Sequence, residues 1–167
     1  MKETNRSTFN TRKLIISALV IALYVVVMAT TSSFAFGAYQ IRIATSFYAL
    51  SYIFPFLVFP LGLANALSNF FFGGLGPIDV AGGFIIGLLF LGSIVLIRHS
   101  RLPRWLIALP IIFVIGLGIP SYLNVLLDLP YWALVINLVI GQILPGLAGI
   151  FLTQALEKPL KSRKVIS

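Results

Sequence analysis

Charged side chains are nearly absent from the central part of this sequence, and this constrains the fold more than any motif does. The chain has a hydrophobic fraction of 59% and a mean hydropathy of +1.05, whereas soluble domains are about half apolar. A helix needs about 20 mostly apolar residues to cross a bilayer. The sequence therefore predicts an all-α membrane protein that forms a single membrane domain over residues 1–167. The six charged residues between positions 14 and 156 are Arg42, Asp79, Arg98, Arg101, Arg104 and Asp128.

The apolar sequence divides into six predicted transmembrane helices. The run from 43 to 72 is too long for one crossing, and Pro55 and Pro60 interrupt it, so we interpret Phe59-Pro60-Leu61-Gly62 as a tight turn. The first apolar stretch exceeds the usual core of a signal peptide, and we interpret it as a retained span. The predicted spans are about 14–31, 43–58, 61–73, 78–97, 105–119 and 132–154.

The basic residues predict the topology. Eleven of the 12 lie in three segments, 1–13, 97–104 and 155–167, and the remaining one is Arg42. Cytoplasmic segments of membrane proteins are enriched in Lys and Arg, which contact anionic lipid headgroups. Six spans put all three segments, and hence both termini, in the cytoplasm, whereas a single span over 43–72 would put residues 98–104 outside. Cations at membrane-flanking ends do not indicate nucleic-acid binding.

The sequence lacks the patterns that would indicate an enzyme or a metal site. It has no Cys, so a disulfide or thiolate framework is excluded, and its only histidine, His99, lies in a basic segment. No Walker A motif and no cluster of metal-ligating residues occurs. We therefore predict no enzymatic activity, no cofactor and no metal, and expect any ATP hydrolysis to reside in separate partner subunits.

Arg42 is the most informative single residue. It lies at the predicted outer end of the second span, where its side chain either extends to the headgroups or holds a ligand. Tyr39 and Gln40 precede it and supply an aromatic face and an amide, as at the mouth of a binding pocket. Asp79 follows Pro77 at the start of the fourth span, where an acid stabilises the helix N-terminus. Alternatively, Asp79 pairs with Arg42 or contacts a ligand.

Four amides lie inside predicted spans, where each needs a hydrogen-bonding partner. Asn65 and Asn69 are four residues apart and share one helix face, whereas Asn137 and Gln142 need not. Both interhelical hydrogen bonds and ligand contacts remain open for these amides. Asp128, just before the sixth span, is expected to cap its N-terminus.

Two pairs of small residues lie four positions apart. Ala18 and Ala22 on the first span permit close approach of a second helix, either from a partner or from the protein's own bundle. Gly83 and Gly87 on the fourth span are expected to serve packing within the bundle.

Four short sequences together resemble the substrate-binding (S) components of energy-coupling factor (ECF) transporters, which are six-helix vitamin-capture proteins of prokaryotes. The resemblance covers about residues 13–157 and is strongest to the queuosine-precursor transporter subfamily. The four sequences are Ala18-Leu-Val-Ile-Ala22, Tyr39-Gln-Ile-Arg42, Gly62-Leu-Ala-Asn65 and Ile78-Asp79-Val80.

The resemblance implies a multi-pass protein of the bacterial plasma membrane that captures a vitamin-like molecule at the outer face. Its implied partners are the ECF module, formed by a transmembrane coupling subunit and two ATPase subunits, and the membrane lipids. Ala18 and Ala22 would then dock on the coupling subunit. The loop from Gly73 to Gly76 would close over the ligand. The expected ligand-binding residues are Tyr39, Gln40, Arg42, Asn69, Asp79 and Tyr122.

Two departures from the subfamily pattern affect the expected ligand. Thr45 and Gln142 occupy positions where the subfamily has acidic residues. A carboxylate pairs with the two donors on the edge of a guanine-like ring, which a hydroxyl cannot do. We therefore expect cobalamin or another corrinoid as the ligand, with a queuosine precursor (a 7-deazaguanine) as the alternative. A structural membrane subunit without a ligand is the competing interpretation from another class.

Overall fold

The computed structural model describes residues 2–37, 39–73 and 75–162, and within these residues all regular secondary structure is helical. Gly74 of the predicted lid, Met1 and residues 163–167 of the predicted cytoplasmic ends lie outside the described residues. The α-helices are α1 (Lys2–Thr30), α2 (Ser32–Ala35), α3 (Leu50–Ile53), α4 (Val58–Ser68), α5 (Pro77–His99), α6 (Ile115–Gly118), α7 (Pro120–Leu127) and α8 (Tyr131–Ser162). Tighter or wider helical turns join them: η1 (Ile43–Ala49), η2 (Pro55–Leu57), η3 (Asn69–Gly73), η4 (Arg104–Ile107) and η5 (Pro110–Val114).

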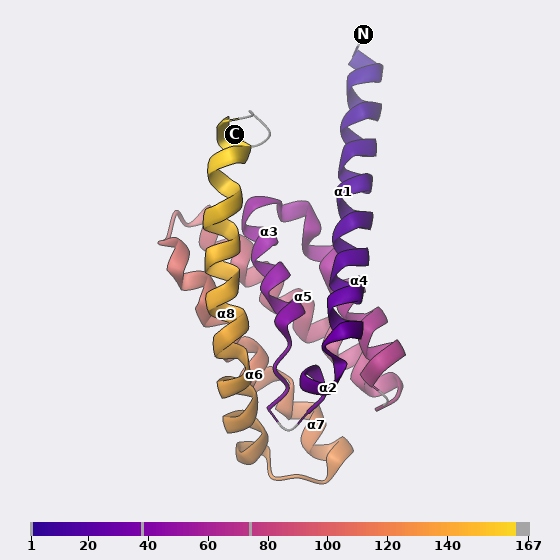
Figure 1. Ribbon diagram of the computed structural model, residues 1–167, viewed down its shortest axis with the longest axis vertical. Helices are drawn as coiled ribbons and strands as arrows, with labels where there is room; N and C mark the ends of the chain where they lie inside the picture. The colour runs from indigo at the N-terminus through magenta and orange to yellow at the C-terminus, as the bar shows by residue number, and fades with distance from the viewer. Residues whose placement is uncertain (1, 38, 74, 163–167) are drawn as a thin grey trace.

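The all-α membrane fold is confirmed, and each predicted span corresponds to a helical stretch. Among the described residues, five stretches are long and apolar enough to cross a bilayer: Asn10–Thr30, Pro55–Gly73, Pro77–His99, Arg104–Leu127 and Tyr131–Glu157. The sixth, Ile43–Ile53, is a shorter apolar helix. At 1.5 Å per residue it would span only about 16 Å as an α-helix, roughly half of the hydrocarbon core. It runs between α1 and α8 and is continued toward the other end by non-helical residues 40–42 (Figure 1).

The break between the second and third stretches differs from the predicted one. The chain turns at Phe54, whose ψ of 85° is not helical, because a residue before proline disfavours the helical region. Pro55 then starts η2. The predicted turn at Phe59–Gly62 was wrong, since Pro60 lies in the first turn of α4. A proline is tolerated there because the first backbone N–H groups of a helix have no intrahelical acceptor.

Asp128 does not cap the last span as predicted. The fifth stretch continues to Leu127, and Asp128 ends it in the left-handed conformation with φ 54°. Aspartate tolerates this conformation better than most residues with a side chain do. The carbonyl of Pro130 instead accepts the first hydrogen bonds of α8, from the backbone N–H groups of Ala133 and Leu134.

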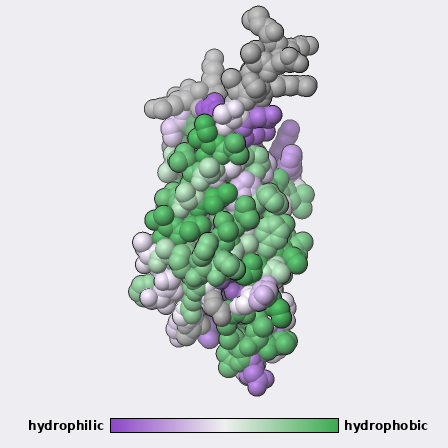
Figure 2. Space-filling model, turned by 90° about the vertical axis from the view of Figure 1, so that its right-hand side faces the viewer, coloured by the Kyte–Doolittle hydropathy of each residue, from purple (hydrophilic) through white to green (hydrophobic). Residues whose placement is uncertain are grey.

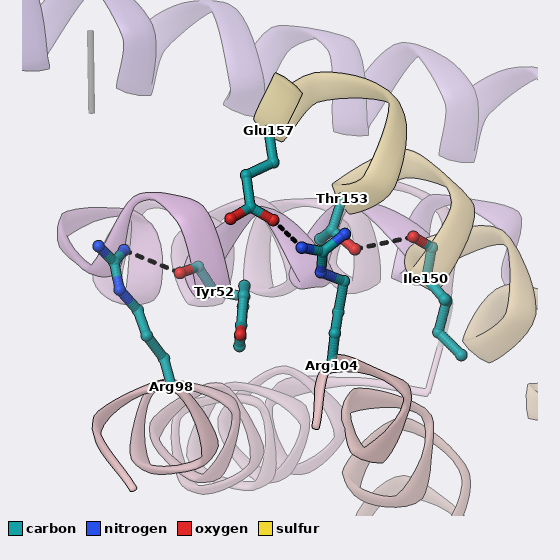
Figure 3. A network of polar contacts seen from close by, with 6 residues as sticks. All are labelled: Tyr52, Arg98, Arg104, Ile150, Thr153 and Glu157. Carbon is teal, nitrogen blue, oxygen red and sulfur yellow. Dashed lines mark hydrogen bonds and ion pairs between the residues drawn. The ribbon is translucent and has the colours of Figure 1, made fainter. Parts of the chain in front are cut away.

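The described basic residues of the 97–104 segment lie at the same end of the bundle as the C-terminal part of α8. Arg98 donates to the carbonyl of Tyr52 at 2.8 Å (Figure 3). It also donates to the carbonyl of Ile53 at 2.5 Å, and both bonds satisfy the C-terminal end of α3. Arg104 forms an ion pair with Glu157 on α8 (Figure 3). The N-terminal part of α1 projects at this end as well (Figure 1). This arrangement matches an even number of crossings, and the assignment of this end to the cytoplasm stays a prediction.

The surface of the bundle is apolar over most of its height. Figure 2 shows a broad hydrophobic belt on the side formed by α1 and α4. α1 is the least buried span, with 11% of its apolar window buried. Ala18 and Ala22 lie on its exposed side, so the alternative in which these alanines pack within the protein's own bundle is not observed, and docking on a partner stays a prediction.

Candidate ligand-binding site

A non-helical segment, residues 39–42, crosses α8 and carries Arg42 into the bundle, with Gln40 at a positive φ of 44°. The contact is very close: a Cβ atom added at Gly141 would lie 1.8 Å from the backbone oxygen of Tyr39. Only glycine fits at this crossing. The next residue, Gln142, donates from Nε2 to the carbonyl of Gln40 at 3.1 Å and so fixes the segment to α8.

The Arg42 side chain points into the bundle and does not extend to the headgroups. It is only 8% exposed. Its Nη1 donates to Asn65 Oδ1 at 3.2 Å and to Asn69 Oδ1 at 3.0 Å. The guanidinium carbon also lies 4.7 Å from the ring centroid of Phe36, a cation–π contact. A buried cation is therefore held by two neutral amides and an aromatic ring.

Asn65 and Asn69 connect α4 to α5 as well as to Arg42. Asn65 Nδ2 donates to the carbonyl of Gly83 at 3.0 Å, and Asn69 Nδ2 donates to the carbonyl of Asp79 at 3.3 Å. A Cβ atom at Gly83 would lie 2.6 Å from Asn69 Nδ2, so this glycine makes room for the amides. The predicted packing role of Gly83 is thus a close approach between α4 and α5.

Asp79 is buried in the first turn of α5 with one carboxylate oxygen unused. Its Oδ1 accepts a hydrogen bond from the Tyr122 hydroxyl at 3.1 Å. Its Oδ2 is buried and has no hydrogen-bond partner. Within the described part of the chain, Asp79 forms no ion pair with Arg42, so of the alternatives for Asp79 the direct pairing is not observed. Asn69 connects the two residues, because it accepts from Arg42 Nη1 and donates to the backbone carbonyl of Asp79.

The structure therefore brings together most of the six predicted site residues. Arg42, Asn69, Asp79 and Tyr122 belong to one connected polar cluster, and Gln40 joins it through its backbone carbonyl. The Tyr39 side chain is 52% exposed and makes none of these hydrogen bonds, so the structure does not bring it into the cluster.

A small enclosed cavity lies beside Arg42. Its volume of about 20 Å³ is enough for one water molecule and far too small for a heterocycle. Polar side chains, apolar side chains and glycines together line this cavity. The lining residues are Gln40, Arg42, Thr45, Tyr48, Asn65, Gly83, Ile86, Gly87, Phe90, Ile115, Ile119 and Gln142.

Sequence reasoning did not predict Thr45 and Tyr48 as site residues. Both follow Arg42 at intervals of three, and η1 is a 3₁₀-helix with three residues per turn. Arg42, Thr45 and Tyr48 therefore share one face. The spacing was present in the sequence, but it indicates a common face only once the segment is known to be 3₁₀-helical.

Three buried polar atoms of the site have no hydrogen-bond partner: Arg42 Nε, Asp79 Oδ2 and Gln142 Oε1. An unsatisfied buried polar atom costs about 1–3 kcal/mol. One of these atoms is a donor and two are acceptors. The site thus has unused capacity for a molecule that offers both acceptors and donors.

A larger hollow of about 620 Å³ lies on the outside of the bundle between α4 and α5. It is mostly apolar, and Phe70 at its edge is 69% exposed. Asn69 is the only amide that lines it. Size alone therefore does not make this groove the binding site, because it lacks the spare donors and acceptors of the Arg42 cluster.

The bundle defines a polytopic membrane protein with a cluster of buried polar side chains between its helices. Comparison with known families makes the class specific: residues 14–158 match the family described as "QueT transporter". The chain belongs to the QueT transporter family and is therefore a transport protein of the membrane. No curated protein and no solved structure matches it. The resemblance to the queuosine-precursor transporter subfamily is confirmed.

Proposed function

We propose that this protein is the S component of an ECF-type importer and captures a queuosine precursor, a 7-deazaguanine, at the outer face of a bacterial plasma membrane. Membership of the QueT transporter family supports this ligand better than the corrinoid expected from Thr45 and Gln142. A transport family also argues against a structural subunit without a ligand.

The carboxylate of Asp79 weakens the argument for a corrinoid. That argument held that the acids needed for a guanine-like edge are missing at Thr45 and Gln142. Asp79, on α5, adds a buried carboxylate that accepts from Tyr122 and has an unpartnered Oδ2, and its backbone carbonyl joins it to Asn69 of the cluster. An amide oxygen of Gln142 is available as a second acceptor.

The three unpartnered atoms are the observation that carries this proposal. A guanine-like edge presents adjacent N–H donors next to a carbonyl acceptor. Asp79 Oδ2 and Gln142 Oε1 can accept from such donors, and Arg42 Nε can donate to the carbonyl. A planar ring also has apolar faces, which suits the apolar side chains of the cavity wall, such as Ile115 and Phe90.

Binding requires the cluster to open. Ligand pockets usually measure about 300–1,000 Å³, whereas the cavity beside Arg42 measures about 20 Å³. The Nη1 contacts of Arg42 with Asn65 and Asn69 are the bonds that a ligand would have to exchange for its own.

The proposed partner is an ECF module with a transmembrane coupling subunit and two ATPase subunits. The exposed Ala18 and Ala22 on α1 support docking on the coupling subunit, because small residues allow close approach of two helices in lipid. Transport energy would come from ATP hydrolysis in the partner subunits.

Isothermal titration calorimetry of the full chain with 7-deazaguanine queuosine precursors and with cobalamin tests the ligand. We expect binding of a deazaguanine, and a loss of about tenfold or more in Asp79→Asn because charge-assisted hydrogen bonds are lost. Asp128→Asn is the matched control, since Asp128 is an exposed acid. Binding of cobalamin alone would restore the corrinoid. Binding of neither would favour a structural subunit.

A further inference from the structure

α1 reaches the polar cluster through one side chain. Among residues 10–30 of α1, whose burial is described, Tyr24 and Met28 are the two that are fully buried, and they lie about one turn apart. The Tyr24 ring stacks on Tyr48 with a centroid distance of 5.5 Å and an interplanar angle of 15°. Tyr24 is therefore the point at which the outermost span contacts the wall of the cavity.

The Tyr24 hydroxyl takes part in two hydrogen bonds with defined directions. It donates to Asn65 Oδ1 at 3.3 Å and lies 3.1 Å from the Tyr48 hydroxyl. A hydroxyl has a single proton, so Tyr48 must donate to Tyr24 in the second bond. Of these two hydrogen bonds, the one to Asn65 connects Tyr24 to an amide that also accepts from Arg42.

Asn65 Oδ1 is shared between Tyr24 and Arg42. It accepts from Arg42 Nη1 at 3.2 Å as well as from the tyrosine. An amide oxygen has two lone pairs, so both are used. A ligand that draws Arg42 away, or turns the Asn65 amide, therefore changes the hydrogen bond that holds Tyr24.

The opposite face of α1 carries Ala18 and Ala22. At about 100° per residue, these alanines are rotated by roughly 240° and 200° from Tyr24. Both alanines are exposed, whereas Tyr24 is buried. α1 thus carries a buried residue at the polar cluster, Tyr24, and an exposed face with Ala18 and Ala22. Because these residues belong to one helix, a displacement of Tyr24 that moves the helix also moves this exposed face.

We propose that Tyr24 is a positioning residue that transmits the state of the Arg42 site to α1. When Arg42 contacts Asn65, Tyr24 and α1 take the position described here. When Arg42 is engaged elsewhere, the Tyr24–Asn65 bond changes and α1 shifts. The part played by a ligand and by docking rests on the proposed function, but the link between Arg42 and α1 does not. Because such coupling is reciprocal, docking at the outer face of α1 would alter ligand affinity by the same factor.

Pulsed EPR distance measurements on the full chain in lipid nanodiscs test this link. The sequence has no Cys, so spin labels can be placed at Val26→Cys on α1 and Ile140→Cys on α8, which are 57% and 51% exposed. The wild type is compared with Arg42→Ala, Tyr24→Phe and the double variant. We expect Arg42→Ala to shift the distance distribution in the wild type but not in Tyr24→Phe.

Tyr131→Phe is the control, because it removes a tyrosine hydroxyl that donates to the carbonyl of Leu117, outside the Arg42 cluster. It should keep the response to Arg42→Ala. Additive shifts in the double variant, or an equal loss in Tyr131→Phe, would overturn the proposal, since the effect would then not depend on the Tyr24–Asn65 bond.

A second arm adds a 7-deazaguanine queuosine precursor to each variant. The ligand should shift the distribution in the wild type and leave it unchanged in Tyr24→Phe, although calorimetry still detects binding there. A ligand shift that persists in Tyr24→Phe would contradict the proposal. If the wild type binds no deazaguanine, the proposed function fails, and the Arg42→Ala comparison still decides the role of Tyr24.

Discussion

Replacing Gly141 by alanine should displace the segment that carries Arg42. The added Cβ would lie 1.8 Å from the carbonyl oxygen of Tyr39 and 3.0 Å from its carbonyl carbon. These are backbone atoms, so no rotamer change relieves the clash. Residues 39–42 must move away from α8 by more than about 1 Å to restore ordinary contact.

The expected cost combines three effects. Overpacking of this kind costs about 1–3 kcal/mol. Displacement also breaks the hydrogen bond from Gln142 to the carbonyl of Gln40, which contributes about 0.5–1.5 kcal/mol. Alanine offsets up to about 1 kcal/mol through its higher helix propensity. The free energy of unfolding should therefore fall by roughly 0.5–4.5 kcal/mol.

Thermal unfolding of the full chain in one detergent measures this effect. Each kcal/mol lowers the Tm of a chain of this size by about 2–4 °C. Gly92→Ala is the matched control, since Gly92 also lies in a membrane-spanning helix and a Cβ there meets nothing within 4 Å. Gly92→Ala should be neutral or stabilising. Equal Tm values for the two variants would refute the close crossing at Gly141.

Three other measurements test the site, the topology and the cytoplasmic end. Gly87 lines the cavity, and a Cβ atom added there meets only Asn65 Nδ2, at 3.7 Å. Gly87→Ala should therefore keep the Tm but weaken deazaguanine binding about tenfold in calorimetry. An unchanged affinity would show that this wall of the cavity is not part of the site. Cysteine labelling should reach Ser100→Cys only from the cytoplasm and Ser33→Cys only from outside, and the reverse pattern would invert the topology. Arg104→Glu should lower the free energy of unfolding by up to about 1 kcal/mol, measured as a lower Tm, and adding Glu157→Arg should restore most of the loss. Additive losses in the double variant would show that the ion pair does not contribute to stability.

The distribution of charge predicted the helical stretches because its physical cause is strong. Burying an ion in hydrocarbon costs several kcal/mol, so long uncharged stretches are the ones that cross. The side assigned to Arg98 and Arg104 then predicts the number of crossings, and that side stays a prediction. Locating the apolar stretches needs no knowledge of packing, which is why the sequence alone predicts them.

The boundaries of the elements depend on weaker and more local preferences. Proline is compatible with a turn and with the first turn of a helix, so Pro55 and Pro60 could not be told apart by sequence. Asp128 similarly fits an N-cap or a left-handed C-terminal position. In each case the choice is decided by contacts with other helices.

The site was predicted only where position along a span was informative. Arg42 stood out because it is the one basic residue outside the three predicted cytoplasmic segments, and Asp79 because it is one of two acids between residues 14 and 156. Thr45 and Tyr48 did not, since their common face depends on the 3₁₀ geometry of η1. Tyr24 is distant in sequence, and nothing in its own surroundings indicates that it contacts the same amide as Arg42.

The contacts of Arg42 suggest how a ligand would be selected. Among the described residues, no carboxylate pairs with this buried cation, which is held by the amides of Asn65 and Asn69. A ligand that opens the site must therefore replace these acceptors with its own, or leave a charged donor unpaired. Sites that hydrogen-bond a polar group reject analogues lacking that group by factors of about 10⁴ or more, far beyond what an apolar contact achieves. Selectivity would then arise from the carbonyl that meets Arg42 and the donors that meet Asp79, because a ligand lacking either group leaves a buried polar atom without a partner.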